Sequence, residues 1–126
     1  MATLILDASV LIGLLDTSDP HHATAVDDVE AADHVGHSLQ TPASAYSETL
    51  VAFARADRVP AARESVAGMG ITVTPLTAVI AERAAALRAE HHRLRLPDAI
   101  VLATARELGA DLLTYDDGLA RVAQRG

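Results

Sequence analysis

The 126-residue chain contains no cysteine, no lysine and no tryptophan, and aromatic residues make up only 2% of it. The absence of cysteine excludes disulfide bonds and thiolate metal sites, and it favours a cytoplasmic location. With so few aromatic side chains, we expect a core of alanine, valine, leucine and isoleucine, which suits α/β or all-α folds better than a β-sandwich.

Long apolar runs and a basic N-terminal flank are also missing. The longest apolar stretch, Ala8–Leu15, is too short to cross a bilayer, and the first residues do not resemble a secretory signal. We therefore expect a single domain over residues 1–126 that has no association with a membrane.

The chain has a formal net charge of −7, so it lacks the broad basic surface of many nucleic-acid-binding proteins. Any contact with a nucleic acid must then be local. Its ten basic residues are all arginine, whose planar fork matches phosphate and carboxylate oxygens. Genomic base composition explains this preference for arginine equally simply.

Short apolar or β-branched runs predict strands at residues 3–6, 38–40, 71–73 and 111–114. Helical periodicity predicts helices at 10–15, 21–32, 59–67 and 77–90. Two further helices are expected after local start signals, with Thr41-Pro42 capping one and Asp98 capping the other. Strands that alternate with helices through short turns predict an α/β fold, in which helices cover both faces of a parallel sheet.

Acidic residues fall where such a sheet places its functional sites, beyond the carboxyl ends of the strands. Asp7 ends the first strand, Asp98 opens a helix, Asp116 follows the last strand, and Glu48 lies within a helix between small alanines. Four converging carboxylates without a lysine would repel one another unless a cation neutralised them. Oxygen-only ligands favour Mg²⁺, with Mn²⁺ as an alternative.

Each acid also has a purely structural explanation. Asp7 and Asp98 are natural helix caps, Asp116 and Asp117 suit a turn before glycine, and Glu48 suits a solvated helix surface. Only the four together favour a catalytic site.

Four short motifs in their order and spacing carry a resemblance to a known family: 6–9 (LDAS), 47–48 (SE), 96–99 (LPDA, followed by LATA) and 113–116 (LTYD). The chain resembles VapC-like PIN domains over essentially its whole length. That resemblance implies a PIN-like three-layer α/β/α fold with a short central parallel sheet.

The resemblance also implies a Mg²⁺-dependent endoribonuclease whose catalytic and metal-binding acids are Asp7, Glu48, Asp98 and Asp116. Ser9 and Thr114 would be supporting hydroxyls. Asp117 competes for the fourth position, although the Thr-x-Asp spacing favours Asp116.

As for partners, the resemblance implies the toxin of a type II toxin–antitoxin system, with a cognate VapB-like antitoxin, an RNA substrate such as tRNA or rRNA, and a homodimer. Relatives usually continue after the last helix into another short strand, whereas this chain ends at residues 119–126. We therefore expect a sheet that is one strand shorter or is completed by a partner.

Basic residues and histidines outside the motifs have two interpretations each. Arg93 and Arg95, just before Asp98, are candidates for holding an RNA phosphate or belong to a solvated loop. The histidine pairs at 21–22, 34 and 37, and 91–92 suggest a transition-metal site, but solvated or capping histidines are the commoner explanation.

Other functions compete with the toxin hypothesis. A receiver-type phosphoacceptor domain shares the α/β plan but needs a lysine beside its aspartate, and a haloacid-dehalogenase-type phosphatase also needs a second aspartate where Ser9 stands. A housekeeping PIN nuclease of RNA maturation and a non-catalytic RNA-binding PIN scaffold remain open.

Overall fold

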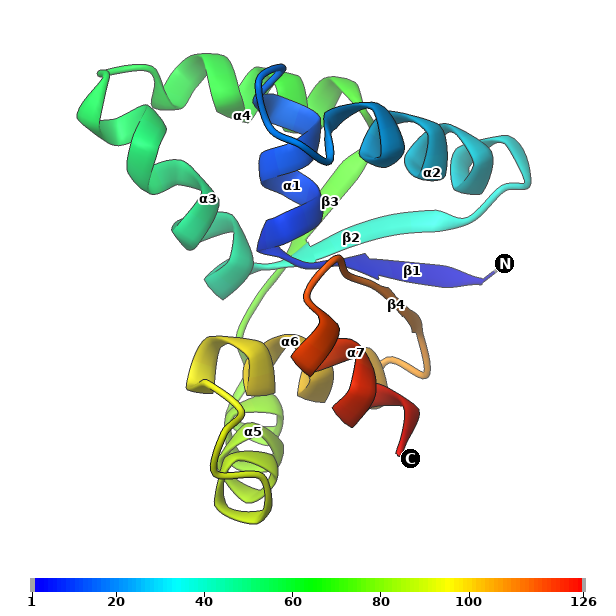
Figure 1. Ribbon diagram of the computed structural model, residues 1–126, viewed down its shortest axis with the longest axis vertical. Helices are drawn as coiled ribbons and strands as arrows, with labels where there is room; N and C mark the ends of the chain where they lie inside the picture. Colours follow the sequence, from blue (N-terminus) through cyan, green and yellow to red (C-terminus); the bar gives the residue numbers. More distant parts are fainter. Residues whose placement is uncertain (1, 126) are drawn as a thin grey trace.

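The computed structural model describes residues 2–125, which form seven helices and a parallel sheet of four strands in the order β3-β2-β1-β4. The strands are β1 (Thr3–Leu6), β2 (Ser38–Pro42), β3 (Ile71–Thr74) and β4 (Asp111–Leu113). On one side of the sheet lie α1 (Ala8–Leu15), α2 (His22–His34), α3 (Ala43–Arg55) and α4 (Val59–Gly68), and on the other lie α5 (Ala78–Glu90), α6 (Leu96–Glu107) and α7 (Asp117–Gln124) (Figure 1). The predicted three-layer α/β/α fold is confirmed.

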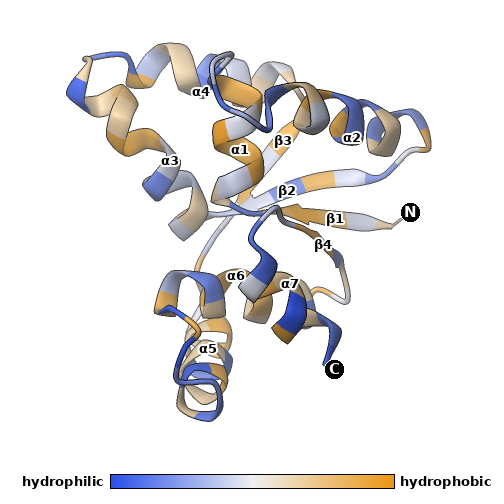
Figure 2. Cartoon of the chain, in the orientation of Figure 1, coloured by the Kyte–Doolittle hydropathy of each residue, from blue (hydrophilic) through white to orange (hydrophobic). Residues whose placement is uncertain are grey.

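Neighbouring residues of β1 enter two different hydrophobic cores, because side chains of a strand alternate between its faces. Ile5 packs with α5, α6 and α7, whereas Leu6 packs with α1, α2 and β3. Every buried hydrophobic side chain of residues 2–125 is alanine, valine, leucine or isoleucine, as the composition predicted. The carboxyl-terminal parts of β1 and β4 are accordingly coloured as hydrophobic in Figure 2.

The predicted helix start at Thr41-Pro42 is wrong. Both residues belong to β2, and Pro42 is the N-cap of α3 without a side-chain hydrogen bond. Thr41 is fully buried, and its hydroxyl donates to the carbonyl of Leu6 at 2.8 Å. This hydrogen bond between strands satisfies a buried hydroxyl that could otherwise have capped a helix.

The predicted cap of α6 is also wrong. The helix begins at Leu96, with Arg95 as its N-cap and Pro97 in its first turn, where a missing N–H costs nothing. Asp98 therefore lies inside the first turn, and its carboxylate is left available for side chains.

Two of the strands are edges of the sheet. β3 and β4 each pair with only one neighbour, and within residues 2–125 no strand follows β4.

Residues 2–125 contain no helix with the length and apolar character that crossing a lipid bilayer requires.

Candidate active site

The strands are all parallel, but the order in which they are added reverses at β1, since β2 and β3 lie on one side of β1 and β4 lies on the other. In parallel sheets such a switch point opens a crevice at the carboxyl ends of the strands. Asp7 and Thr114 directly follow these two strands. We call Asp7, Glu48, Asp98 and Asp116 the acid site.

Asp7 is the most deeply placed of the four acids, with only 4% of its surface exposed. It is the N-cap of α1, and its Oδ1 accepts hydrogen bonds from the backbone N–H of Val10 at 3.1 Å and from the hydroxyl of Ser9 at 2.6 Å. The hydroxyl of Thr114 donates to its other oxygen, Oδ2. Capping and site geometry are therefore combined in one carboxylate rather than being alternatives.

Two relays of hydrogen bonds connect β1 to the chain after β4. The N–H of Tyr115 donates to Ser9 Oγ at 3.0 Å, and the N–H of Asp116 donates to Thr114 Oγ1 at 3.0 Å. Each hydroxyl accepts from the backbone and donates to Asp7, so its orientation is fixed. Ser9 and Thr114 thus hold Asp7 between two segments that are distant in sequence.

Burial raises the pKa of Asp7 above its ordinary value of 3.8, because the charged form is poorly solvated there. The hydrogen bonds from Ser9, Thr114 and Val10 act in the opposite direction, and the charge of Asp98 raises the pKa further. Asp7 is therefore a carboxylate that would gain from a nearby cation.

Glu48 approaches from α3 and is half-buried. Burial raises its pKa above 4.5, the charge of Arg95 lowers it, and the charges of Asp98 and Asp7 raise it again. Glu48, in the middle of α3, is thus close enough to Asp7 and Asp98 for their negative charges to raise its pKa.

Arg95 is the cation closest to these acids. Its Nε lies 3.3 Å from Asp98 Oδ2, and its Nη2 lies 3.9 Å from Glu48 Oε2. The side chain of Asp98 is 15% exposed, whereas that of Arg95 is 65% exposed and can swing into solvent. Arg95 partly neutralises the acid site, a role that its sequence position alone did not indicate.

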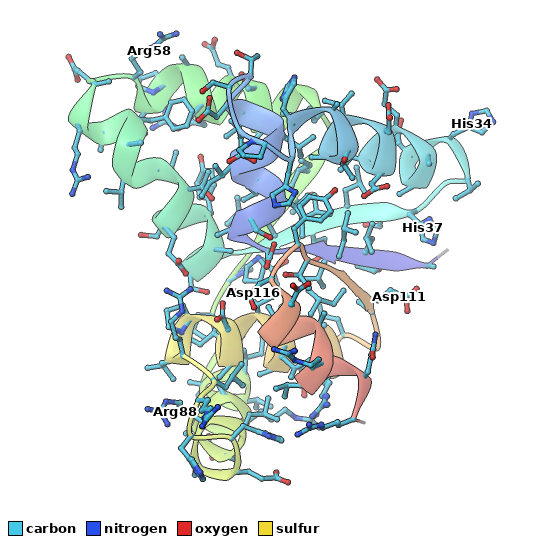
Figure 3. All side chains as sticks on the ribbon, in the orientation of Figure 1. His34, His37, Arg58, Arg88, Asp111 and Asp116 are labelled. Atoms are coloured by element: carbon cyan, nitrogen blue, oxygen red, sulfur yellow. The ribbon has the colours of Figure 1, made fainter. Side chains whose placement is uncertain are left out.

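Asp116 lies at the start of α7, where the two helical layers meet, while Asp111 lies at the opposite end of β4 (Figure 3). Asp116 is exposed and is the N-cap of α7, and its Oδ1 accepts a hydrogen bond from the N–H of Leu119 at 2.8 Å. After Asp98 and Glu48, its charge adds to the rise in the pKa of Arg95. Asp117 is the first residue of α7, and its charge does not contribute to this rise in the pKa of Arg95.

Among residues 2–125, no three aspartate, glutamate or histidine side chains are close enough to form a complete metal cage. This arrangement still fits Mg²⁺, which keeps several of its waters and binds through one or two carboxylates. The donors are all oxygens, no cysteine exists in the chain, and Asp7 and Glu48 carry unfavourable negative charge. The residues present therefore suit a largely hydrated divalent ion.

The histidines make other contacts. His22 Nδ1 lies 2.7 Å from the carbonyl oxygen of Gly13, and His37 Nδ1 lies 3.3 Å from that of Ala32. Both His34 and His37 are distant from Asp116 in Figure 3. The part of the chain from residue 2 to 125 holds no histidine-based metal cluster.

Tyr115 is a residue near the acid site that the sequence did not single out. Its hydroxyl donates to Asp28 Oδ2 at 2.7 Å, and its ring stacks on that of His21 with centroids 4.8 Å apart. Burial and the hydrogen bond to Asp28 raise the pKa of Tyr115. No local sequence signal could have found this contact, because Tyr115 and Asp28 are 87 residues apart in the chain.

Comparisons with known proteins agree with this fold. Solved structures that resemble the chain include VapC20 of Mycobacterium tuberculosis, a toxin that cleaves the sarcin–ricin loop, with 21% identity, a TM-score of 0.73 and 94% of each chain covered. A toxin–antitoxin complex from Klebsiella pneumoniae shares 26% identity and a TM-score of 0.71, covering 90% of this chain and 87% of that one. VapBC2 of Rickettsia felis, solved with a DNA fragment of its promoter, shares 10% identity and a TM-score of 0.76, covering 95% and 92%.

No curated protein matches the chain at a significant level. The model of the PIN domain family, in contrast, matches residues 4–125, which is nearly the whole sequence. The chain therefore belongs to the PIN domain family.

Proposed function

We propose that this protein is a Mg²⁺-dependent endoribonuclease, built as one PIN domain, and the toxin of a type II toxin–antitoxin pair. The observation that carries the proposal is the shared electrostatic environment of Asp7, Glu48 and Asp98 at the switch point of the sheet. Carboxylates that repel one another in this way create a site for a divalent ion, and PIN family membership supports nuclease chemistry. Mn²⁺ would fit the same donors.

Asp7 and Asp98 would hold the ion, with Glu48 and Asp116 contributing directly or through water. When bound, the ion supplies charge neutralisation at the phosphodiester and a more acidic water for in-line attack. Ser9 and Thr114 keep Asp7 oriented through their hydrogen bonds. Glu48, whose pKa is raised, is suited to take a proton from the attacking water or give one to the leaving oxygen.

The toxin assignment is supported by structural neighbours that are VapC toxins and toxin–antitoxin complexes. By analogy with them, the partner is a cognate VapB-like antitoxin and the substrate is a structured RNA such as tRNA or rRNA. The homodimer stays a prediction.

Asp98→Asn and Asp7→Asn test the proposal, because each removes a ligand charge without changing side-chain volume. We expect both variants to lose Mg²⁺-dependent cleavage of purified tRNA and rRNA to the level seen with EDTA, while circular dichroism remains unchanged. Asp111→Asn is the matched control, since this exposed aspartate lies at the other end of β4, and it should cleave normally.

Full cleavage by either acid-site variant would refute the nuclease assignment. If the unaltered protein bound RNA but never cut it, the non-catalytic scaffold would be the correct alternative.

A further inference from the structure

A second charged region of the molecule lies outside the acid site. A cavity of about 590 Å³ opens between α7 and the loop that joins α5 to α6. Its charged lining consists of three arginines, Arg93, Arg121 and Arg125, against a single glutamate, Glu90, and we call it the basic cavity. In a chain with net charge −7, this concentration of positive charge is unlike the surface as a whole.

The packing of α7 turns two of these arginines to the same side. Arg121 lies in α7 and Arg125 is the C-cap residue four positions later, so the two lie one turn apart on the same side of the helix. Leu119, which is 1% exposed, and Val122 anchor α7 to the core formed with α6. The alternation of hydrophobic and hydrophilic residues along α7 is visible in Figure 2.

The loop opposite α7 is also held in place. Leu94 is only 5% exposed, and its N–H donates to the carbonyl of His91 at 2.9 Å. This tight turn leaves His92 and Arg93 exposed, and His91 and His92 line the cavity beside Arg93. The loop therefore presents its polar side chains from a fixed position.

The three arginines have no carboxylate within 4.0 Å among residues 2–125, whereas Arg83 is paired with Glu107 and Arg95 with the acid site. Unpaired guanidinium groups that share one cavity repel one another, and an anion would relieve this repulsion. Their planar forks match phosphate oxygens in particular.

The basic cavity is next to the acid site. Gly118 belongs to its lining, and a Cβ at that position would come within 3.2 Å of Asp116 Oδ1. An RNA strand near the acids would be repelled by them, so it needs a neighbouring group of positive charges to hold its backbone.

We propose that the basic cavity binds backbone phosphates of a single-stranded segment of the RNA substrate, where that segment extends from the acid site. This inference rests on the proposed function for its substrate class, and it adds Arg121 and Arg125 to the binding surface. Because phosphates are the same in every nucleotide, the cavity contributes affinity and strand direction, and it does not read sequence.

The test uses the double variant Arg121→Ala/Arg125→Ala and a fluorescent oligouridine, with EDTA present so that no cleavage occurs. We expect roughly tenfold weaker binding at low salt, as for the loss of charged contacts. The slope of log Kd against log salt should become smaller by roughly 1.4, because each lost single-strand phosphate contact removes about 0.7. The double variant Arg55→Ala/Arg63→Ala removes the same charge from exposed positions on α3 and α4 and should bind as the unaltered protein does.

Equal weakening in both double variants would overturn the proposal in favour of a diffuse charge effect, and so would unchanged RNA binding in the cavity variant. If a polyglutamate peptide bound the protein and lost affinity in the cavity variant while RNA did not, the cavity would take an acidic protein segment instead. If the unaltered protein cuts RNA and the cavity variant binds RNA normally, only the proposal for the basic cavity is refuted. Loss of RNA binding in the cavity variant, with no cleavage by any form, refutes only the nuclease.

Discussion

The acid site and the basic cavity adjoin each other at the start of α7, yet they are built differently. Asp7 is 4% exposed and accepts three hydrogen bonds, and its neighbouring acids come from three other elements. The arginines of the basic cavity are exposed and come from one loop and one helix. The negative charge of Asp7 is thus buried and fixed, while the positive charge of the basic cavity is left in water on flexible side chains.

This difference shows that the unfavourable electrostatic energy of the molecule is concentrated at the buried carboxylate and not at the exposed arginines. A buried carboxylate loses solvation, so it persists only if hydrogen bonds and the surrounding elements hold it. An exposed guanidinium keeps its water and requires only a stable backbone. The acid site should therefore lower the free energy of unfolding, and its geometry should depend on the whole fold. The arginines of the basic cavity should change the free energy of unfolding very little.

Leu119→Ala should have the largest effect, because α7 and its two cap residues carry Asp116 and two of the three arginines of the cavity, Arg121 and Arg125. Removing a fully buried leucine side chain is expected to lower the free energy of unfolding by about 2–5 kcal/mol. Urea denaturation measures this loss. Leu76→Ala, at a position that is 47% exposed, is the control and should change stability by less than about 1 kcal/mol. Similar losses in both variants would mean that α7 is not anchored as described.

Asp7→Asn should change how the stability of the protein depends on pH, which tests the cost of the buried charge in the acid site. The raised pKa means that folded Asp7 binds its proton more tightly than unfolded Asp7 does. Ionisation therefore lowers stability as pH rises from 3.8 through the raised value, and the loss remains at neutral pH. Without metal, the asparagine variant should melt at a higher temperature than the unaltered protein at pH 7.

This advantage should disappear below pH 3.8, where Asp7 is neutral in both states. Thermal melts in EDTA across this range provide the measurement, with Asp111→Asn as the matched control. A lower melting temperature for Asp7→Asn at pH 7 would show that its hydrogen bonds outweigh the cost of burial.

Arg95→Gln should have the smallest effect on stability, within about 0.5 kcal/mol, because its ion pairs are exposed to solvent. Its electrostatic effect should nevertheless be measurable. Arg95 lowers the pKa of Glu48, so the variant should raise that pKa, as seen by NMR titration of carboxyl-labelled protein without metal. An unchanged Glu48 titration would place Arg95 outside the acid site.

Local sequence patterns predicted much of the fold correctly, but the two helix starts show their limit. Thr41-Pro42 and Asp98 both carry the usual signals of a cap, yet Thr41 bonds across the sheet to Leu6 and Asp98 pairs with Arg95. Asp98 lies inside a helix that starts two residues earlier, at Leu96, whereas for Thr41 a tertiary contact used the hydroxyl that local chemistry would have assigned to the helix end. The same reason hides the contact of Tyr115 with Asp28.

The sequence alone determined the alternation of strands and helices, the aliphatic core and the placement of acids after strands, because these follow from periodicity and from short-range chemistry. Only the tertiary structure decided how Thr114 meets Asp7 and Tyr115 meets Ser9, and how Arg93 comes to line one cavity with Arg121 and Arg125. Those contacts join segments far apart in the chain. Their geometry depends on how α7 and the strands pack, which no local pattern contains.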